Sequence, residues 1–431
     1  MFQTKTWRAR QGIGLNKFSI GGAAPVTLVN MPDQVIIPGD AFSEENMNDL
    51  ERRIAMACAE TYGVKIDKSN SNPESAVEYT DGAAGLTPSS GNGGSFIPGS
   101  WSDKYPFNKI RPCLVKNGAV VGYLNPDNYA QFEDGTAADI TSGAAGDVMV
   151  EIPIFYYKIS HNDTHTFVQI SSAPLDGFTD KAFRYNGELT DAFYVGAYSG
   201  YVDSNNKLRS LSGKTPTGSK TIGAFRTAAH ANGDGYEQLN FYKLTALQIL
   251  FLIRYKSLNS QAALGQGYTS GSNTAAAQTG ATNDKGMNYG DTSTTGRVKC
   301  NGIEDFFGNI FQWVDGYKAT SATMIKTADG NFNDNATGYE EHPCTVPNKS
   351  GYLKDIVGDN ELAFTPKTFG GSSSTYYADY GSLSSGSLPA FGGSWAWGAG
   401  AGAFFLFCAS ASNSAPDVGA RLLLCKATKA A

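Results

Sequence analysis

The stretch FGGSWAWGAGAGAFFLFCASASNSAPDVGARLLL, residues 391–424, decides how the rest of the chain is interpreted. Between residues 370 and 420 the only charged side chains are Asp379 and Asp417. A charge-poor stretch of this kind fits either the buried core of an antiparallel sheet or a binding face, on which rigid rings give contact area at low entropic cost. The large aromatic residues of the stretch, framed by Gly, Ser and Ala, are Trp395, Trp397, Phe404, Phe405 and Phe407.

Composition limits the function classes that remain. The 431 residues suffice for two or three domains or for one elaborated domain. Charged residues make up only 17% and the net charge is -6, so we expect no nucleic-acid or anionic-membrane partner. The 50 glycines and 12% aromatic residues indicate a β-rich chain with many turns.

Metal, cofactor and membrane signals are lacking in the sequence. The six cysteines show no CxxC pair and no Cys/His spacing typical of zinc, so we expect neither a metal nor a cofactor. The N-terminal residues lack the apolar core of a signal peptide. Residues 244–255, the most apolar stretch, are too few to span a bilayer, so we expect no membrane insertion. The cysteines are Cys58, Cys113, Cys300, Cys344, Cys408 and Cys425.

Residues 1–80 are predicted to form a small strand and helix region. Short apolar runs up to residue 42 indicate strands, and Ser43 is a plausible N-cap for a helix over residues 43–62. Met47, Leu50, Ile54 and Ala57 form one apolar stripe on it. One such helix cannot bury its stripe alone, so it either docks on the preceding strands or assembles with copies of itself.

The opening IIPGDAFSEENMNDLERRI, residues 36–54, resembles the openings of phage tail and baseplate proteins. The resemblance implies virion attachment and oligomerisation for residues 1–80. Residues 81–100 are rich in Gly, Ser and Pro and are predicted to be a linker. A globular domain then follows over residues 101–431.

Within that domain we predict few elements and long loops. Residues 147–159 and 191–198 favour strands, and residues 166–170 favour a hairpin partner for the first of them. Residues 244–255 predict the main buried helix. Residues 259–295 and 318–388 are polar and are interpreted as long loops.

Three segments carry a second resemblance. They are GIEDFFGNIFQWVDG at residues 302–316, FGGSW at residues 391–395 and VGAR at residues 418–421. In order and separation they resemble the C-type lectin-like fold in its formylglycine-generating-enzyme-like branch, and within it the variable proteins of diversity-generating retroelements. This implies an α+β lectin-like domain with loop-rich insertions, and a variable region over about residues 393–421.

The resemblance also implies which residues differ between variants. Trp397 is a special case, because replacing both adenines of an Asn codon does not produce a Trp codon; the residue is either fixed or derived from another template codon. The implied variable, ligand-binding residues are Ala396, Trp397, Gly400, Phe405, Phe407, Ala409, Ser412 and Asp417. The implied scaffold residues are Gly392, Gly393, Trp395, Gly419 and Arg421.

The expected protein is therefore a phage tail receptor-binding protein in the virion tail, without enzymatic activity. Its expected partners are a host cell-surface protein or glycan, other tail or baseplate proteins, and two further copies in a homotrimer. Glu304, Asp305 and Asn309 are expected to satisfy backbone donors of turns.

Three alternatives stay open. One is a tail protein with structural duties only. Another is an enzyme of the formylglycine-generating type, for which the only late cysteines are Cys408 and Cys425, and Cys408 lies in an apolar run with no basic residue nearby. The third is a calcium-dependent lectin, whose typical Glu-Pro-Asn or Gln-Pro-Asp and Trp-Asn-Asp triplets do not occur.

Overall fold

The computed structural model describes residues 17–18, 26–27, 44–270, 272–293 and 295–426. The chain forms two units, Met1–Glu60 and Thr61–Ala431. In the first, strands β1 (Lys17–Phe18) and β2 (Val26–Thr27) pair antiparallel. The other strands expected before residue 43, and the expected N-cap at Ser43, lie outside the described residues.

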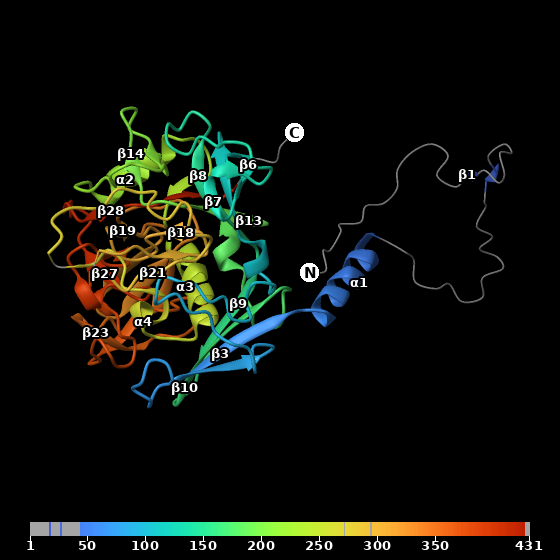
Figure 1. The fold of residues 1–431 in the computed structure, drawn as a ribbon. Coiled ribbons are helices and arrows are strands. Elements are labelled where there is room, and N and C mark those ends of the chain that lie inside the picture. Colours follow the sequence, from blue (N-terminus) through green and yellow to red (C-terminus); the bar gives the residue numbers. More distant parts are fainter. Residues whose placement is uncertain (1–16, 19–25, 28–43, 271, 294, 427–431) are drawn as a thin grey trace. The chain divides into compact units, whose positions relative to one another are not determined.

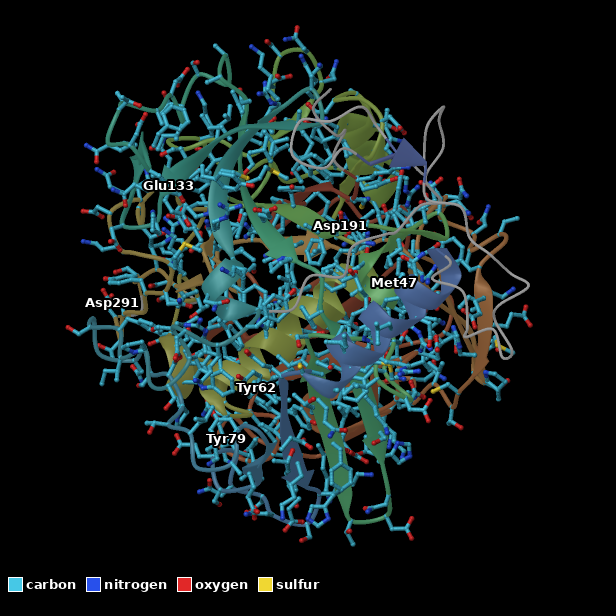
Figure 2. All side chains as sticks on the ribbon, turned by 90° about the vertical axis from the view of Figure 1, so that its right-hand side faces the viewer. Met47, Tyr62, Tyr79, Glu133, Asp191 and Asp291 are labelled. Carbon is cyan, nitrogen blue, oxygen red and sulfur yellow. The ribbon has the colours of Figure 1, made fainter. Side chains whose placement is uncertain are left out.

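Helix α1 (Glu44–Ala57) ends five residues before the predicted boundary, because Tyr62 belongs to a strand of the second unit. Its predicted apolar stripe is open to solvent. Leu50 is 39% exposed and Ile54 is 38% exposed, while Met47, labelled in Figure 2, is half-buried. Helix α1 therefore carries apolar side chains that are not buried within the described chain.

The second unit is mostly β-sheet, in agreement with the expected α+β class at its coarser level. Its largest sheet has seven strands in the order β16-β29-β13-β8-β5-β6-β7. Strand β29 lies between β13 and β16, so residues 422–424 are held inside the sheet. The strands are β5 (Arg111–Lys116), β6 (Ala119–Asn125), β7 (Asn128–Phe132), β8 (Asp147–Pro153), β13 (Ala192–Gly196), β16 (Tyr236–Gln238) and β29 (Leu422–Leu424).

A four-stranded sheet, β4-β3-β10-β9, forms one edge of the unit in Figure 1. The predicted hairpin of residues 166–170 with the preceding strand is confirmed by the β9 and β10 ladder. The predicted strand 147–159 is two strands, because β8 and β9 belong to different sheets. The strands are β3 (Thr61–Asp67), β4 (Val77–Asp81), β9 (Tyr156–His161) and β10 (His165–Ser171).

Strand β3 pairs with both β4 and β10, so residues 61–81 share a sheet with residues 156–171. The chain divides at residue 60, whereas the sequence predicted a boundary near residue 100 and a linker over residues 81–100. The backbone N–H groups of Ser89 and Gly91 donate to the carbonyl oxygens of Arg254 and Ala263, both at 2.9 Å. Tyr62 and Tyr79, which Figure 2 labels, pack on the buried Trp101 at centroid distances of 5.5 and 5.6 Å. Residues 61–100 are thus part of the second unit.

Helix α3 (Phe241–Tyr255) is the buried helix that the sequence predicts, and every one of its residues is buried. The Asn240 side chain caps it by accepting from the N–H of Lys243, and Lys256 ends it in the left-handed conformation with φ 50°. A helix that is apolar on all sides belongs in the interior. None of the described helices is long and apolar enough to cross a membrane.

The two long predicted loops contain regular structure. The first contains α4 (Ser260–Leu264). The second contains two three-stranded sheets, β20-β21-β22 and β24-β23-β25. Their strands are β20 (Tyr317–Ser321), β21 (Met324–Thr327), β22 (Glu340–Pro343), β23 (Lys349–Ile356), β24 (Pro366–Phe369) and β25 (Tyr380–Leu383).

The remaining described elements are short. Helix α2 (Ile222–His230) packs beside β16. Three two-stranded ladders join β11 (Arg184–Tyr185) to β12 (Glu188–Leu189), β14 (Tyr201–Val202) to β15 (Leu208–Arg209), and β17 (Lys299–Cys300) to β18 (Ile303–Glu304). Single 3-10 turns occupy Phe107–Lys109, Lys181–Phe183 and Gly398–Gly400.

Candidate binding face

Residues 392–405 form a loop between two paired strands. Strand β26 (Leu388–Phe391) pairs antiparallel with β27 (Leu406–Ala409), with Phe391 opposite Leu406. On its other side β26 pairs with β19 (Phe311–Trp313), which in turn pairs with β28 (Val418–Gly419). Residues 392–405 therefore leave the sheet and return to it at the same place.

Side chains of β27 alternate between interior and surface, as the two-residue period of a strand requires. Leu406 and Cys408 are buried, whereas Phe407 and Ala409 are half-buried. The loop before the strand exposes Ala396 and leaves Trp397 half-buried. Ser412, which follows the strand, is exposed. We call these surface positions the face: Ala396, Trp397, Phe407, Ala409 and Ser412.

Two residues expected to contact a ligand lie in the interior instead. Phe405 is 0% exposed, and its ring packs on Phe311 at 5.2 Å and on Trp397 at 4.9 Å. Gly400 is also buried, and a Cβ there would lie 3.0 Å from the Cβ of Tyr380. Neither can touch a ligand in this conformation, so both are reassigned to the support of the face.

Asp417, a third expected contact, is half-buried and partly engaged. Its carboxylate accepts a hydrogen bond from the hydroxyl of Ser394 at 3.0 Å, and its carbonyl oxygen accepts from the N–H of Phe311 at 2.9 Å. These bonds tie β28 to the loop and to β19. Asp417 therefore contributes first to the position of the loop.

The aromatic side chains of the face pack against the buried ring of Phe311. Phe311 lies 5.7 Å from Trp397 and 5.3 Å from Phe407, measured between ring centroids. Tyr380 of β25 joins from the other side, 5.4 Å from Trp397. Pairs at these separations are favourable beyond their area burial. The half-buried rings are therefore held at fixed positions although part of each meets solvent.

The scaffold residues assigned from the resemblance lie inside. Gly392 and Gly393 have φ of 95° and 84°, and a Cβ on Gly393 would come within 2.6 Å of the Cβ of Ala401. Trp395 is 8% exposed, and its N–H donates to the carbonyl oxygen of Asn309. A Cβ on Gly419 would lie 2.8 Å from the carbonyl oxygen of Thr217.

Arg421 is buried and donates hydrogen bonds to backbone oxygens, which agrees with its assignment to the scaffold. Its guanidinium donates to the carbonyl oxygens of Gly196, Glu304 and Asp305 at 2.8 to 2.9 Å, and to the side chain of Gln312 at 2.7 Å. Burial lowers the pKa of Arg421 to about 10.

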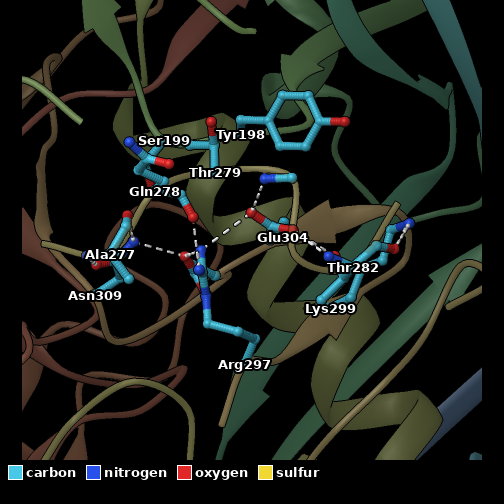
Figure 3. A network of polar contacts seen from close by, with 12 residues as sticks. Tyr198, Ser199, Ala277, Gln278, Thr279, Thr282, Arg297, Lys299, Glu304 and Asn309 are labelled. Atoms are coloured by element: carbon cyan, nitrogen blue, oxygen red, sulfur yellow. Dashed lines mark hydrogen bonds and ion pairs between the residues drawn. The ribbon is translucent and has the colours of Figure 1, made fainter. Parts of the chain in front are cut away.

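Figure 3 shows the charged network that surrounds the predicted Glu304-Asp305 motif. The Glu304 carboxylate accepts from the N–H groups of Gly280 and Thr282, each at 2.7 Å. Arg297 donates to Asp305 at 2.7 Å and to Glu304 at 3.1 Å. Burial alone would lower the pKa of Arg297, but the charges of Asp305 and Glu304 raise it.

The network holds the loop before β17 against the face. The Asn309 side chain accepts from the N–H of Ala277 at 2.8 Å and donates to its carbonyl oxygen at 3.1 Å. Farther along the loop, the carbonyl oxygen of Thr269 accepts from the N–H of Gly398. The prediction that these residues satisfy backbone donors is confirmed for Glu304 and Asn309, whereas the Asp305 carboxylate accepts from the side chains of Arg297 and Asn309. We call the following residues the foundation: Arg297, Glu304, Asp305, Asn309 and Arg421.

A second polar support lies under residues 398–404. The buried carboxylate of Asp379 accepts from the hydroxyl of Ser260 at 2.7 Å and from the N–H of Phe404 at 2.8 Å. Gln261 donates to the carbonyl oxygens of Gly398 and Ala401 at 2.8 and 2.9 Å. Burial raises the pKa of Asp379 to about 7. The sequence flags Asp379 only as an isolated charge.

The late cysteines are poorly suited to thiol chemistry, and one acidic cluster is poorly suited to metal binding. Burial raises the pKa of the Cys408 thiol to about 11 and that of Cys425 to about 12. Among the described residues Glu340, His342 and Glu361 could approach one metal ion. The ammonium group of Lys181 forms ion pairs with the carboxylates of Glu340 and Glu361, so their negative charge is already balanced by a cation.

Comparisons with known proteins are sparse. No protein-family model and no curated protein matches the chain. Two solved structures, titled "Major Tropism Determinant M1 Variant" and "Major Tropism Determinant U1 Variant", are 14% and 13% identical to it. Each alignment covers 74% of this chain and 84% of the other, with TM-scores of 0.29 and 0.27. Such TM-scores establish no common fold.

Proposed function

We propose that this chain is the receptor-binding protein of a phage tail, and that the face binds a molecule on the surface of the host cell. The observation that carries the proposal is the pair Trp397 and Phe407. Both rings are partly open to solvent in an almost uncharged segment, yet buried aromatic and polar groups hold them in place. Rigid, amphipathic rings between small residues are what recognition surfaces use.

The proposal includes the finer fold and the origin of variability. The second unit adopts the C-type lectin-like fold of the formylglycine-generating-enzyme-like branch, and a retroelement diversifies the face. The foundation supports this, because its contacts come from residues outside the face, so substitutions at the face leave it intact. A nearby reverse transcriptase gene, with a repeat of the codons for residues 393–421 that differs only at adenines, is the genomic test.

The function is binding and not catalysis. The thiol of a formylglycine-generating enzyme must ionise to react, whereas burial raises the pKa of both late cysteines well above neutrality. The purified chain is expected to show no turnover of a cysteine-containing peptide. Turnover that is lost in Cys408→Ser would contradict this view.

Several copies acting together would raise the avidity of the face. Leu50 and Ile54 on α1 are exposed apolar residues one helical turn apart, which suits assembly of three copies into a homotrimer. Linked sites gain affinity through effective concentration without new contacts. Light scattering of the full chain is expected to give the mass of a trimer, and a monomer mass would contradict this part.

The central experiment replaces both rings of the face. In the double variant Trp397→Ser and Phe407→Ser, adsorption of the full chain to cells of the strain on which the phage is propagated should fall at least about ten-fold. Val121→Ser is the matched control, because Val121 is a 57% exposed apolar residue on β6. Unchanged adsorption of the double variant, with the same melting temperature as wild type, would refute the proposed function.

A further inference from the structure

We infer that the face is the variable half of a larger binding surface. Tyr352 and Tyr380, from β23 and β25, form its constant half, a fixed aromatic subsite for a protein on the host surface. The inference rests on the proposed function. It adds residues outside the variable region, taken from a segment that the sequence presents as a polar loop. It also commits to a protein, whereas the proposed function admits a protein or a glycan.

The two tyrosines continue the row of rings that begins in the face. Tyr352 and Tyr380 are register partners on neighbouring strands, with ring centroids 5.5 Å apart and an interplanar angle of 79°. From Tyr380 the row passes to Trp397 at 5.4 Å, and from Trp397 to Phe407 at 6.2 Å. All four are half-buried, so each ring is anchored on one side and accessible on the other.

The fixed half is locked to the loop that carries the variable half. Tyr380 directly follows Asp379, whose carboxylate holds the N–H of Phe404. Two residues farther along β25, the hydroxyl of Ser382 accepts from the N–H of Cys408 in β27 at 3.0 Å. The strand that carries Tyr380 therefore moves together with the loop and with β27.

Position along the chain separates the two halves. Variation limited to residues 393–421 cannot reach Tyr352 or Tyr380, so every variant of the face keeps both rings. A constant subsite gives every variant a basal affinity, and the changing residues beside it then decide specificity. This resembles hot-spot rings surrounded by adaptable polar contacts in other recognition surfaces.

The chemistry of the subsite favours a protein as ligand. Neither phenolic hydroxyl forms a hydrogen bond within the described part of the chain, so both are free to bond with a partner. The carboxylate nearest in sequence, Asp379, is buried and already engaged. The exposed Lys354, two residues along β23, supplies a charge at the rim. Neutral tyrosine and tryptophan at the centre with charge at the rim is the composition of protein interfaces.

The test measures adsorption of the full-length chain to host cells. The double variant Tyr352→Ser and Tyr380→Ser should lose at least about ten-fold in adsorption. The double variant with Phe at both positions keeps the rings and should lose less. Tyr123→Ser on β6 is the matched control, because Tyr123 is also half-buried and lies on a different sheet. Adsorption of the wild type should disappear on cells treated with proteinase K and persist on cells treated with periodate.

A measurement on the wild-type chain gives a result that does not depend on the folding of the variants. Nitration of wild type by tetranitromethane should be suppressed at Tyr352 and Tyr380 in the presence of cells, but not at Tyr123. Unchanged adsorption of the serine variant together with unprotected tyrosines would overturn the inference and leave the proposed function standing. Sensitivity to periodate alone would overturn the choice of a protein. Lack of adsorption by the wild type would refute the proposed function, and this inference with it.

Discussion

The foundation and the face lie next to each other but are built from opposite chemistry. Four of the five foundation residues are charged, all are buried or nearly so, and every guanidinium and carboxylate has a partner. The face has no charged side chain, and its large residues touch mainly other rings. A buried charge needs specific partners at specific distances, whereas ring packing tolerates substitution of neighbours.

The difference predicts where the chain can vary. Removing one member of the foundation leaves the other polar groups without partners in a low-dielectric interior. The free energy of unfolding is therefore expected to fall by a large amount. Removing a half-exposed ring gives back only part of a transfer free energy. Variation is therefore tolerated on the face and excluded in the foundation. Three tests, one of which compares two substitutions, sharpen this contrast.

The first test is Arg421→Met, one of the two substitutions with the largest expected effect. Methionine keeps much of the volume but makes none of the donations to Gln312 and to the carbonyl oxygens of Gly196, Glu304 and Asp305. The free energy of unfolding in urea should fall by about 3–5 kcal/mol.

Arg111→Met is the matched control for this loss. The Arg111 guanidinium pairs with Glu151 at 3.2 Å, but its side chain is 43% exposed. Exposed pairs contribute about 0–1 kcal/mol, so the control should lose little. Equal losses of unfolding free energy in the two variants would show that the buried polar contacts of the foundation contribute no more to stability than an exposed ion pair.

The second test separates two neighbouring phenylalanines. Phe405→Ala should cost about 3–5 kcal/mol, because the ring is fully buried and leaves a cavity against Phe311. Phe407→Ala should cost about 1–2 kcal/mol, because part of that ring already meets water. Thermal unfolding of both variants gives the comparison. If Phe407→Ala were the costlier change, the assignment of Phe405 to the interior would be wrong.

These phenylalanines also show how far the sequence could predict the face. The resemblance implied surface positions for Phe405, Phe407 and Ala409, and the two-residue period of β27 explains why Phe407 and Ala409 are half-buried while Leu406 and Cys408 are buried. The same alternation carried one step back puts Phe405 on the surface, and it fails there because Phe405 precedes β27 and follows a turn closed by its own N–H to Gly402. Outside a strand, the two-residue period does not set the direction of a side chain.

The long polar segments could not be predicted, because their order comes from distant residues. Residues 277–282 have little intrinsic preference for any structure, and Glu304 and Asn309 fix them through side-chain hydrogen bonds. Tyr380 likewise became part of the site only through the pairing of β25 with β23. Local patterns contain no sign of such contacts. The motif around Glu304 and the interior position of Arg421 were predictable, because buried polar groups must find partners.

The third test concerns Asp379, which belongs to neither group. It is a single buried carboxylate beneath residues 398–404. Its folded-state pKa is raised to about 7 from an ordinary value of 3.8. Between these values the folded chain binds a proton that the unfolded chain has released, so its stability falls as the pH rises from about 4 to about 7. Protonated Asp379 fits the site, and ionised Asp379 is penalised by burial.

Asp379→Asn removes this titration and keeps an oxygen that can accept from Ser260 and Phe404. The free energy of unfolding of the variant minus that of wild type should increase by on the order of 2 kcal/mol as the pH rises from about 5 to about 8. Asp139→Asn is the control: hydrogen bonds from Ser142 and Thr141 lower the pKa of Asp139 to about 2, so its difference from wild type should stay constant over that range. A constant difference for Asp379→Asn as well would mean that Asp379 is ionised throughout. The loop beneath the face would then rest on a full charge, as the foundation does.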